Sequence, residues 1–206
     1  EDTTYLFRTN AKVNEHSARM LKKLNKPIAL IEAQHTGKSK SMSSSSFMGL
    51  QCSIYLVVGA KVVMTCNVCQ QAGLCNGATG IVKDLVYDED VLPPKLPKFV
   101  WVDFDDKYKG PSFFPGNDSR RGWFPVHPIM ATEWTPSSRE NRGYEEHSRT
   151  MLPLSLAWAW TVWKSQGQTL KDKVVCELGS KEPEAGITYT AFSRVTKMVN
   201  FGVIGG

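Results

Sequence analysis

The sequence of 206 residues predicts an α/β protein in which a β-rich block interrupts a domain of alternating strands and helices. Three observations predict this class. The chain begins with a strand, a helix and a second strand. Short apolar runs with turn signals and no helical period fill its middle, and strands and helices alternate again from about Leu152. The simplest arrangement is one α/β domain with a small SH3-like β-barrel inserted in its middle.

The first part of the α/β domain is expected at residues 1–56. Residues 4–8 (TYLFR) predict a short buried strand. Residues 10–24 predict a helix, because their apolar side chains roughly share one helical face, and Asn10 is the expected N-cap. An Asn-Lys-Pro sequence then ends the helix.

Residues 27–33 (PIALIEA) predict a second strand, and a serine-rich stretch follows at residues 39–46. That stretch is too polar and too simple in composition to pack, so we expect it to be mobile. Between the two, Gly37-Lys38-Ser39 imitates a phosphate-binding loop and would suit a small nucleotide kinase. The full motif needs a glycine where this chain has Glu32, whose carboxylate would repel phosphates, so a solvated loop is favoured.

The inserted block is expected at residues 57–148, and the second part of the α/β domain at residues 149–206. Within the block, β-type runs occur at residues 57–65, 80–87 and 99–104. Asn-Gly, Pro-Pro and Gly-Pro turn signals separate them, and such closely spaced strands are typical of a small barrel.

The composition limits the compartment and the class of partner. The net charge of +5 is compatible with a phosphate-bearing partner without identifying one. No apolar run is long enough to span a membrane, so we expect no membrane partner. The N-terminal residues do not form a signal peptide, and they fit a piece cut from a longer chain.

Cysteine usage favours free thiols. Five cysteines without regular spacing indicate an intracellular, reducing compartment, which would be the nucleus or the mitochondrion in a eukaryote. Cys66, Cys69 and Cys75 include a zinc half-site, but no second pair completes it, so we expect no bound metal.

Two motifs near the C-terminus carry the chemistry. The sequence TVWKSQGQTL (residues 161–170) places a glycine among polar side chains, between an apolar run and a strand, where the backbone can approach a polyanion. The sequence TYTAFSRV (residues 188–195) ends a short helix with Arg194. The intervening strand and helix are what two motifs on adjacent edges of one parallel sheet would need.

These motifs give the chain a family resemblance. It resembles the second RecA-like domain of a superfamily 1 helicase of the Pif-type, RecD-like group, a domain that is split in sequence by an inserted SH3-like barrel. The resemblance covers nearly the whole chain and is carried by residues 6–21, 57–82, 152–170 and 187–205. The order NGATG, KSQGQTL, AFSRV makes it specific.

The resemblance implies a nucleotide site that this chain shares with a partner domain. Arg194 matches the arginine finger that reaches the γ-phosphate of ATP, where a planar fork of fixed charge stabilises the transferring group. Arg8 matches an earlier phosphate-contacting arginine. Gly167 and Gln168 match the motif that approaches the phosphates and sugar. ATP and Mg²⁺ would bind mainly to an N-terminal RecA-like domain.

The resemblance also implies a surface for single-stranded DNA. Thr161, Trp163, Lys164 and Ser165 match the part of the motif that faces the strand. The family usually has histidine where this chain has Trp163, whose indole can still stack on a base. Asn76 lies in an Asn-Gly turn that leads into the inserted barrel beside the DNA channel.

The expected function is therefore the C-terminal motor half of a 5′ to 3′ ATP-dependent DNA helicase, inactive without its first domain. Expected partners are single-stranded DNA, DNA junctions and the N-terminal RecA-like domain, with the protein acting as a monomer. A non-catalytic module that only binds nucleic acid or protein is the alternative.

Overall fold

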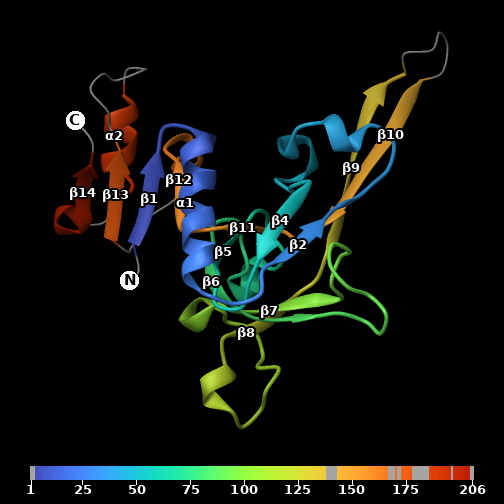
Figure 1. Cartoon of the computed structure of the whole chain (residues 1–206), viewed down its shortest axis with the longest axis horizontal. Coiled ribbons are helices and arrows are strands. Elements are labelled where there is room, and N and C mark those ends of the chain that lie inside the picture. The colour runs from blue at the N-terminus through green and yellow to red at the C-terminus, as the bar shows by residue number, and fades with distance from the viewer. Residues whose placement is uncertain are drawn as a thin grey trace. The chain divides into compact units, whose positions relative to one another are not determined.

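The computed structural model describes residues 3–137, 143–166, 170, 173–177, 186–195 and 197–204. The chain divides into two compact units, shown in Figure 1. Unit 1 comprises Glu1–Asn25 and Leu156–Gly206, and unit 2 comprises Lys26–Ser155. The sequence analysis divided the chain at residues 56 and 148 instead.

Unit 1 is built on a parallel sheet of four strands in the order β12-β1-β13-β14. Tyr5 of β1 lies in register with Ala159 of β12 on one side and with Val175 of β13 on the other. The parallel α/β character expected from the sequence is therefore confirmed. The strands are β1 (Thr3–Phe7), β12 (Ala159–Thr161), β13 (Lys173–Glu177) and β14 (Phe201–Ile204).

Helix α1 (Asn10–Lys23) packs on β12 and β1 and confirms the predicted helix. Its N-cap is Thr9, not Asn10: Thr9 has an extended backbone, and its Oγ1 accepts a hydrogen bond from the Lys12 N–H at 3.4 Å. The preceding strand fixes this register, because β1 ends at Phe7 and only Arg8 lies between the strand and the cap. Asn25 adopts a left-handed conformation (φ 47°) just after the helix, which agrees with the helix end predicted at the Asn-Lys-Pro sequence.

Two tryptophans contribute to the core of unit 1. Trp158 and Trp160 are 7% and 8% exposed, beside the fully buried Leu6, Val174 and Cys176. A second helix, α2 (Ile187–Phe192), follows β13 and leads into β14.

Unit 2 contains three sheets, of five, three and two strands, in the orders β11-β5-β6-β7-β8, β3-β10-β9 and β2-β4. None of them closes on itself among the described residues, so the predicted SH3-like barrel is not confirmed. Figure 1 shows β9 and β10 as a long hairpin. The strands are β2 (Ala29–Glu32), β3 (Gln34–His35), β4 (Ser53–Leu56), β5 (Lys61–Met64), β6 (Thr79–Val86), β7 (Phe99–Asp103), β8 (Trp123–Val126), β9 (Ile129–Pro136), β10 (Tyr144–Met151) and β11 (Leu154–Leu156).

Strand β2 confirms the strand predicted at residues 27–33, but it pairs antiparallel with β4 inside unit 2. Ile31 of β2 is fully buried and lies in register with Ile54. Apolar pairing across this ladder therefore joins residues 29–56 to unit 2 and not to the parallel sheet.

The expectation that the serine-rich stretch does not pack is wrong. It forms two short 3-10 helices, η1 (Ser39–Ser41) and η2 (Ser44–Phe47), around the side chain of Arg149 from β10. The fully buried guanidinium donates hydrogen bonds to the carbonyl oxygens of Ser39, Met42 (2.9 Å) and Leu50 (2.7 Å). One distant arginine thus satisfies backbone groups that the serines themselves could not.

The Gly37-Lys38-Ser39 sequence is not arranged as a phosphate-binding loop. The Lys38 main-chain N–H donates to Nδ1 of His147 at 3.1 Å, and Lys38 Nζ lies 3.7 Å from Glu145 Oε2. Ser39 begins a single 3-10 turn, whereas phosphate binding uses the N-terminus of an α-helix. The nucleotide-kinase alternative therefore loses its structural basis.

Candidate functional site

The carboxyl ends of the parallel strands bring functional candidates to one edge of unit 1. Arg8 directly follows β1, and Val162 directly follows the neighbouring β12. The Val162 N–H donates to the Phe7 carbonyl oxygen at 3.0 Å, which joins the two strand ends. In open α/β sheets, ligands bind at this edge. The half-buried Arg8 and the segment after Thr161 therefore start from adjacent positions.

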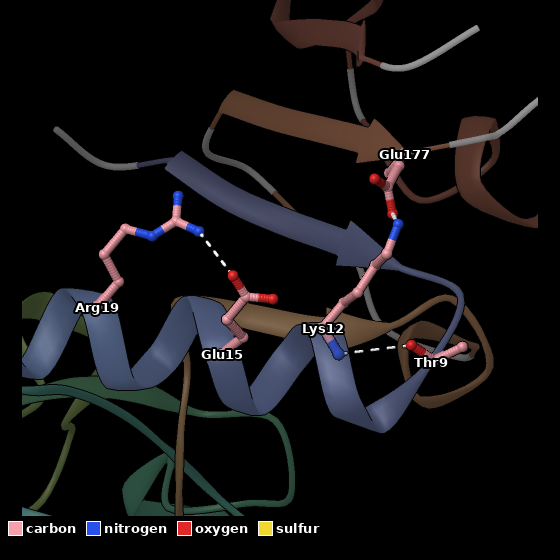
Figure 2. A network of polar contacts seen from close by, with 5 residues as sticks. All are labelled: Thr9, Lys12, Glu15, Arg19 and Glu177. Atoms are coloured by element: carbon pink, nitrogen blue, oxygen red, sulfur yellow. Dashed lines mark hydrogen bonds and ion pairs between the residues drawn. The ribbon is translucent and has the colours of Figure 1, made fainter.

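A polar network fixes α1 over this edge (Figure 2). Lys12 Nζ lies 2.6 Å from Glu177 Oε2, so an ion pair ties the first turn of α1 to the end of β13. Along the helix, Arg19 Nη2 lies 3.3 Å from Glu15 Oε1. The first pair joins the helix to a strand end, whereas the second lies within the helix. The sequence analysis missed Lys12 and Glu177, because no local signal joins residues 165 positions apart.

A cleft of about 540 Å³ lies within unit 1 along α1. His16 closes part of it: its imidazole is 8% exposed and packs 4.2 Å from the Tyr5 ring and 5.5 Å from the Phe7 ring, centroid to centroid. Burial, followed by the charges of Arg19 and Lys23, lowers the pKa of His16. The cleft thus has an aromatic wall, a neutral imidazole at neutral pH and a charged rim. Its lining residues are Thr3, Tyr5, Phe7, Lys12, Glu15, His16, Arg19, Met20, Lys23, Glu177 and Ile204.

The four predicted DNA-facing residues divide into an inner and an outer pair. Thr161 is buried, and its Oγ1 accepts from the Lys164 N–H at 3.3 Å. Ser165 is fully buried, and its hydroxyl donates to the Val162 carbonyl oxygen at 2.6 Å. These bonds shape the 3-10 turn η6 (Trp163–Ser165). Trp163, which is 43% exposed, and the exposed Lys164 face solvent and are the pair available to a ligand.

The structure brings Arg194 next to the end of the first late motif. The Leu170 N–H donates to the Arg194 carbonyl oxygen at 2.8 Å, and α2 packs against η6. The half-buried Arg194 side chain is oriented by its own helix end: Nε donates to the Thr190 carbonyl oxygen (3.2 Å), and Nη2 to the Ser193 hydroxyl (2.9 Å). The two late motifs therefore meet in space. Gly167 and Gln168 lie outside the described residues.

Asn76 belongs to unit 2, in a turn at the end of the connection between β5 and β6 (residues 65–78). Its side chain is exposed, and its main-chain N–H donates to Oδ1 of Asn67 at 2.9 Å. Gly77 has a φ of 91°, which explains the glycine and confirms the predicted turn.

The cysteines show no pairing, and Cys66, Cys69 and Cys75 differ in exposure. Cys66 is buried, which raises the pKa of its thiol, whereas Cys69 is exposed. Across the described ranges, no group of three or more potential ligands from His, Cys, Asp and Glu is placed to hold a metal ion. Among those same residues, no helix combines the length and apolar character needed to cross a membrane.

No protein-family model matches the sequence. Among curated proteins, the chain is 24% identical over 218 residues to the ATP-dependent DNA helicase Pif1 of Campylobacter jejuni, covering 98% of this chain and 44% of that relative. It is 31% identical over 164 residues to the ATP-dependent DNA helicase PIF1 of Homo sapiens, covering 78% of this chain and 21% of that relative. The chain thus spans less than half of the length of these relatives.

Solved structures agree with this relationship. A Pif1 helicase from Candida albicans matches 99% of this chain and 45% of its own, with a TM-score of 0.69 and 25% identity. A Bacteroides Pif1 in complex with ADP-AlF3 and single-stranded DNA matches 98% of this chain and 40% of its own, with a TM-score of 0.63 and 25% identity. The chain is therefore a relative of the Pif1 DNA helicases that corresponds to the C-terminal half of their chain.

Proposed function

We propose that this chain is the C-terminal motor half of an ATP-dependent DNA helicase, in which it supplies an arginine finger and part of the surface that holds single-stranded DNA. The observation that carries the proposal is the hydrogen bond between Leu170 and Arg194, which joins the two late motifs beside one parallel sheet. The relatives named ATP-dependent DNA helicases, and the solved relative that holds a nucleotide analogue and single-stranded DNA, support it.

Arg194 suits the role of a finger by its geometry. The bonds to Thr190 and Ser193 hold Nε and Nη2, and Nη1 makes no hydrogen bond to the described residues. A guanidinium whose orientation is fixed by its own helix end can approach a phosphoryl group with little reorganisation. When ATP and Mg²⁺ are bound, they supply the phosphoryl group and the charge that neutralises it.

The partner domain is the second part of this proposal. In this proposal, Arg194 and Arg8 supply positive charge to the phosphate end of a nucleotide. The described residues contain no cluster of carboxylates that could hold Mg²⁺. We place the Mg²⁺ and most of the ATP contacts on an N-terminal RecA-like domain, so this chain alone should not hydrolyse ATP. Relative movement of the two domains would then drive the motor along one strand, 5′ to 3′.

Trp163 and Lys164 are the proposed contacts to single-stranded DNA in unit 1. An exposed indole beside a flexible cation combines base stacking with phosphate attraction, which binds strands with little sequence preference. Thr161 and Ser165 act through the backbone by shaping η6. In unit 2, we place the turn at Asn76 beside the DNA channel, as an element of an SH3-like fold. DNA junctions as substrates, a monomeric state and an intracellular location complete the proposal.

The test is single-strand binding by this chain, measured as fluorescence anisotropy of labelled oligo-dT. Trp163→Ala should weaken binding by about 5- to 150-fold, since stacking on an aromatic side chain contributes about 1–3 kcal/mol per base. Trp134→Ala removes another exposed tryptophan, on β9 of unit 2, and serves as the matched control. Unchanged affinity of Trp163→Ala at moderate salt, or no binding by the unaltered chain, would contradict the proposal.

A further inference from the structure

The segment between β7 and β8 carries aromatic rings that the proposed function does not use. Side chains of β7 alternate between the buried core of its sheet and an outer face, where Trp101 is half-exposed. Residues 104–122 extend away from this sheet and return to it at β8 (Figure 1). Within this segment, Phe113 and Phe114 pack on Trp101, with ring centroids 6.0 and 4.9 Å away. Phe113 remains 47% exposed.

Cations lie over these rings. The Arg120 guanidinium carbon is 5.1 Å from the centroid of the Phe114 ring and 4.9 Å from that of Trp123, and Lys83 Nζ is 5.7 Å from the Trp123 ring. Arg120 itself is exposed. An exposed guanidinium held near aromatic rings in this way can still offer part of its planar surface and its N–H donors to a ligand. We name Phe113, Phe114, Arg120 and Trp123 the Arg120 surface.

We propose that the Arg120 surface is a second binding site for single-stranded nucleic acid, on unit 2. Unpaired bases would stack on the exposed ring of Phe113 and on the plane of Arg120, while Arg120 and Arg121 donate to phosphate oxygens. Stacking accepts every base, because each has a flat π-face. This inference rests on the proposed function, since it extends the proposed strand contact from Trp163 and Lys164 to a second surface.

The local charge indicates which force dominates. Residues 103–123 contain four acidic and four basic side chains: Asp103, Asp105, Asp106 and Asp118 against Lys107, Lys109, Arg120 and Arg121. Asp103 is neutralised by Lys83 at 3.2 Å. A balanced segment exerts little long-range attraction on a polyanion, so stacking must carry most of the affinity of this site. Its loss should therefore change the salt dependence of binding only slightly.

The experiment compares variants of the 206-residue chain on two labelled strands of equal length, oligo-dT and an abasic backbone without bases. Phe113→Ala should weaken oligo-dT binding by about fivefold or more and leave abasic binding unchanged. Arg120→Lys keeps the charge but loses the flat stacking face, so it should weaken oligo-dT binding as well. Tyr55→Ala and Lys95→Ala alter an exposed ring and an exposed cation elsewhere in unit 2 and should leave both affinities unchanged.

Three results would overturn the inference: oligo-dT binding by Phe113→Ala within about twofold of the unaltered chain, equal losses on the two strands, or an equal loss in Tyr55→Ala. Thermal melting of each variant shows whether unit 2 still folds, and the exposed position of Phe113 makes retained folding the expected result. If Trp163→Ala weakens binding and Phe113→Ala does not, the inference of a second site is refuted and the proposed function stands. If the unaltered chain binds no strand, the proposed function is itself refuted.

Discussion

Replacing Arg149 by methionine should release the serine-rich segment from unit 2. Arg149→Met keeps an unbranched apolar stem of similar length but removes the three hydrogen bonds to Ser39, Met42 and Leu50. It also removes the guanidinium that lies 4.5 Å from the Phe47 ring centroid. The carbonyl oxygens of Met42 and Leu50 then lose their donor inside a region where the arginine side chain is fully buried, whereas the Ser39 carbonyl keeps the Met42 N–H at 3.3 Å.

The expected cost follows from those carbonyls. A buried polar group left without a partner costs about 1–3 kcal/mol, so the two carbonyls set an upper range of about 2–6 kcal/mol. Local opening lets the carbonyl oxygens reach water, and the variant avoids the cost of burying a charge, so the lower end applies. We expect a loss of about 3 kcal/mol in the free energy of local unfolding, which is about a 150-fold change in the opening equilibrium.

Amide hydrogen exchange measures this opening directly. In Arg149→Met, amides of residues 39–50 should exchange about 150-fold faster, and trypsin should cleave at Lys38 and Lys40 more rapidly. Arg121→Met, which alters an exposed arginine of the same unit, is the control and should change neither rate. A loss below about 1 kcal/mol would show that water, and not Arg149, satisfies these carbonyls.

Two further predictions concern unit 1. In the full-length protein, Arg194→Ala should leave ATP affinity nearly intact and lower turnover by roughly 10³-fold or more, as for other arginine fingers, and near-normal ATPase turnover would show that the finger is misassigned. The pKa of His16 is lower in the folded state than in the unfolded chain, so its contribution to stability is complete above about pH 6.5 and is lost as the pH falls toward the lowered value. The free energy of opening of β1, measured by hydrogen exchange, should fall with decreasing pH by at most about 1.4 kcal/mol per pH unit. This pH dependence should disappear in His16→Leu. An equal slope in that variant would assign the effect to another group.

Local patterns were sufficient for the elements of unit 1 that lie close together in the sequence. The apolar face of residues 10–24 and the short run at residues 4–8 predicted α1 and β1, because packing on one side of an element leaves a period in the sequence. The late motifs were predicted to be neighbours, and the bond between Leu170 and Arg194 places their main chains side by side. Between them lie a strand of five residues and a short helix of six.

Long-range polar contacts could not be predicted in this way. Arg149 lies 99 or more residues from the carbonyls it binds, and nothing in the serine-rich stretch indicates that a buried cation supplies its donors. The ion pair between Lys12 and Glu177 could not be predicted either, because these residues also lie far apart in the sequence. For β2, the apolar run was read correctly as a strand, but a strand's partner depends on which apolar face meets it, and here Ile54 of β4 does so. Sheet closure depends on many such pairings at once.

The two proposed DNA contacts use the same chemistry on different elements. On η6, the exposed ring of Trp163 precedes Lys164, and on the β7–β8 segment the exposed ring of Phe113 lies in one cluster with Arg120. Neither pair presents the bidentate donor and acceptor pattern that reads base edges in a groove. An indole also lacks the titratable proton of the histidine that the Pif-type family usually has at this position. Contacts of this kind would hold a strand of any sequence, which is what the proposed motor half needs in order to move along one strand.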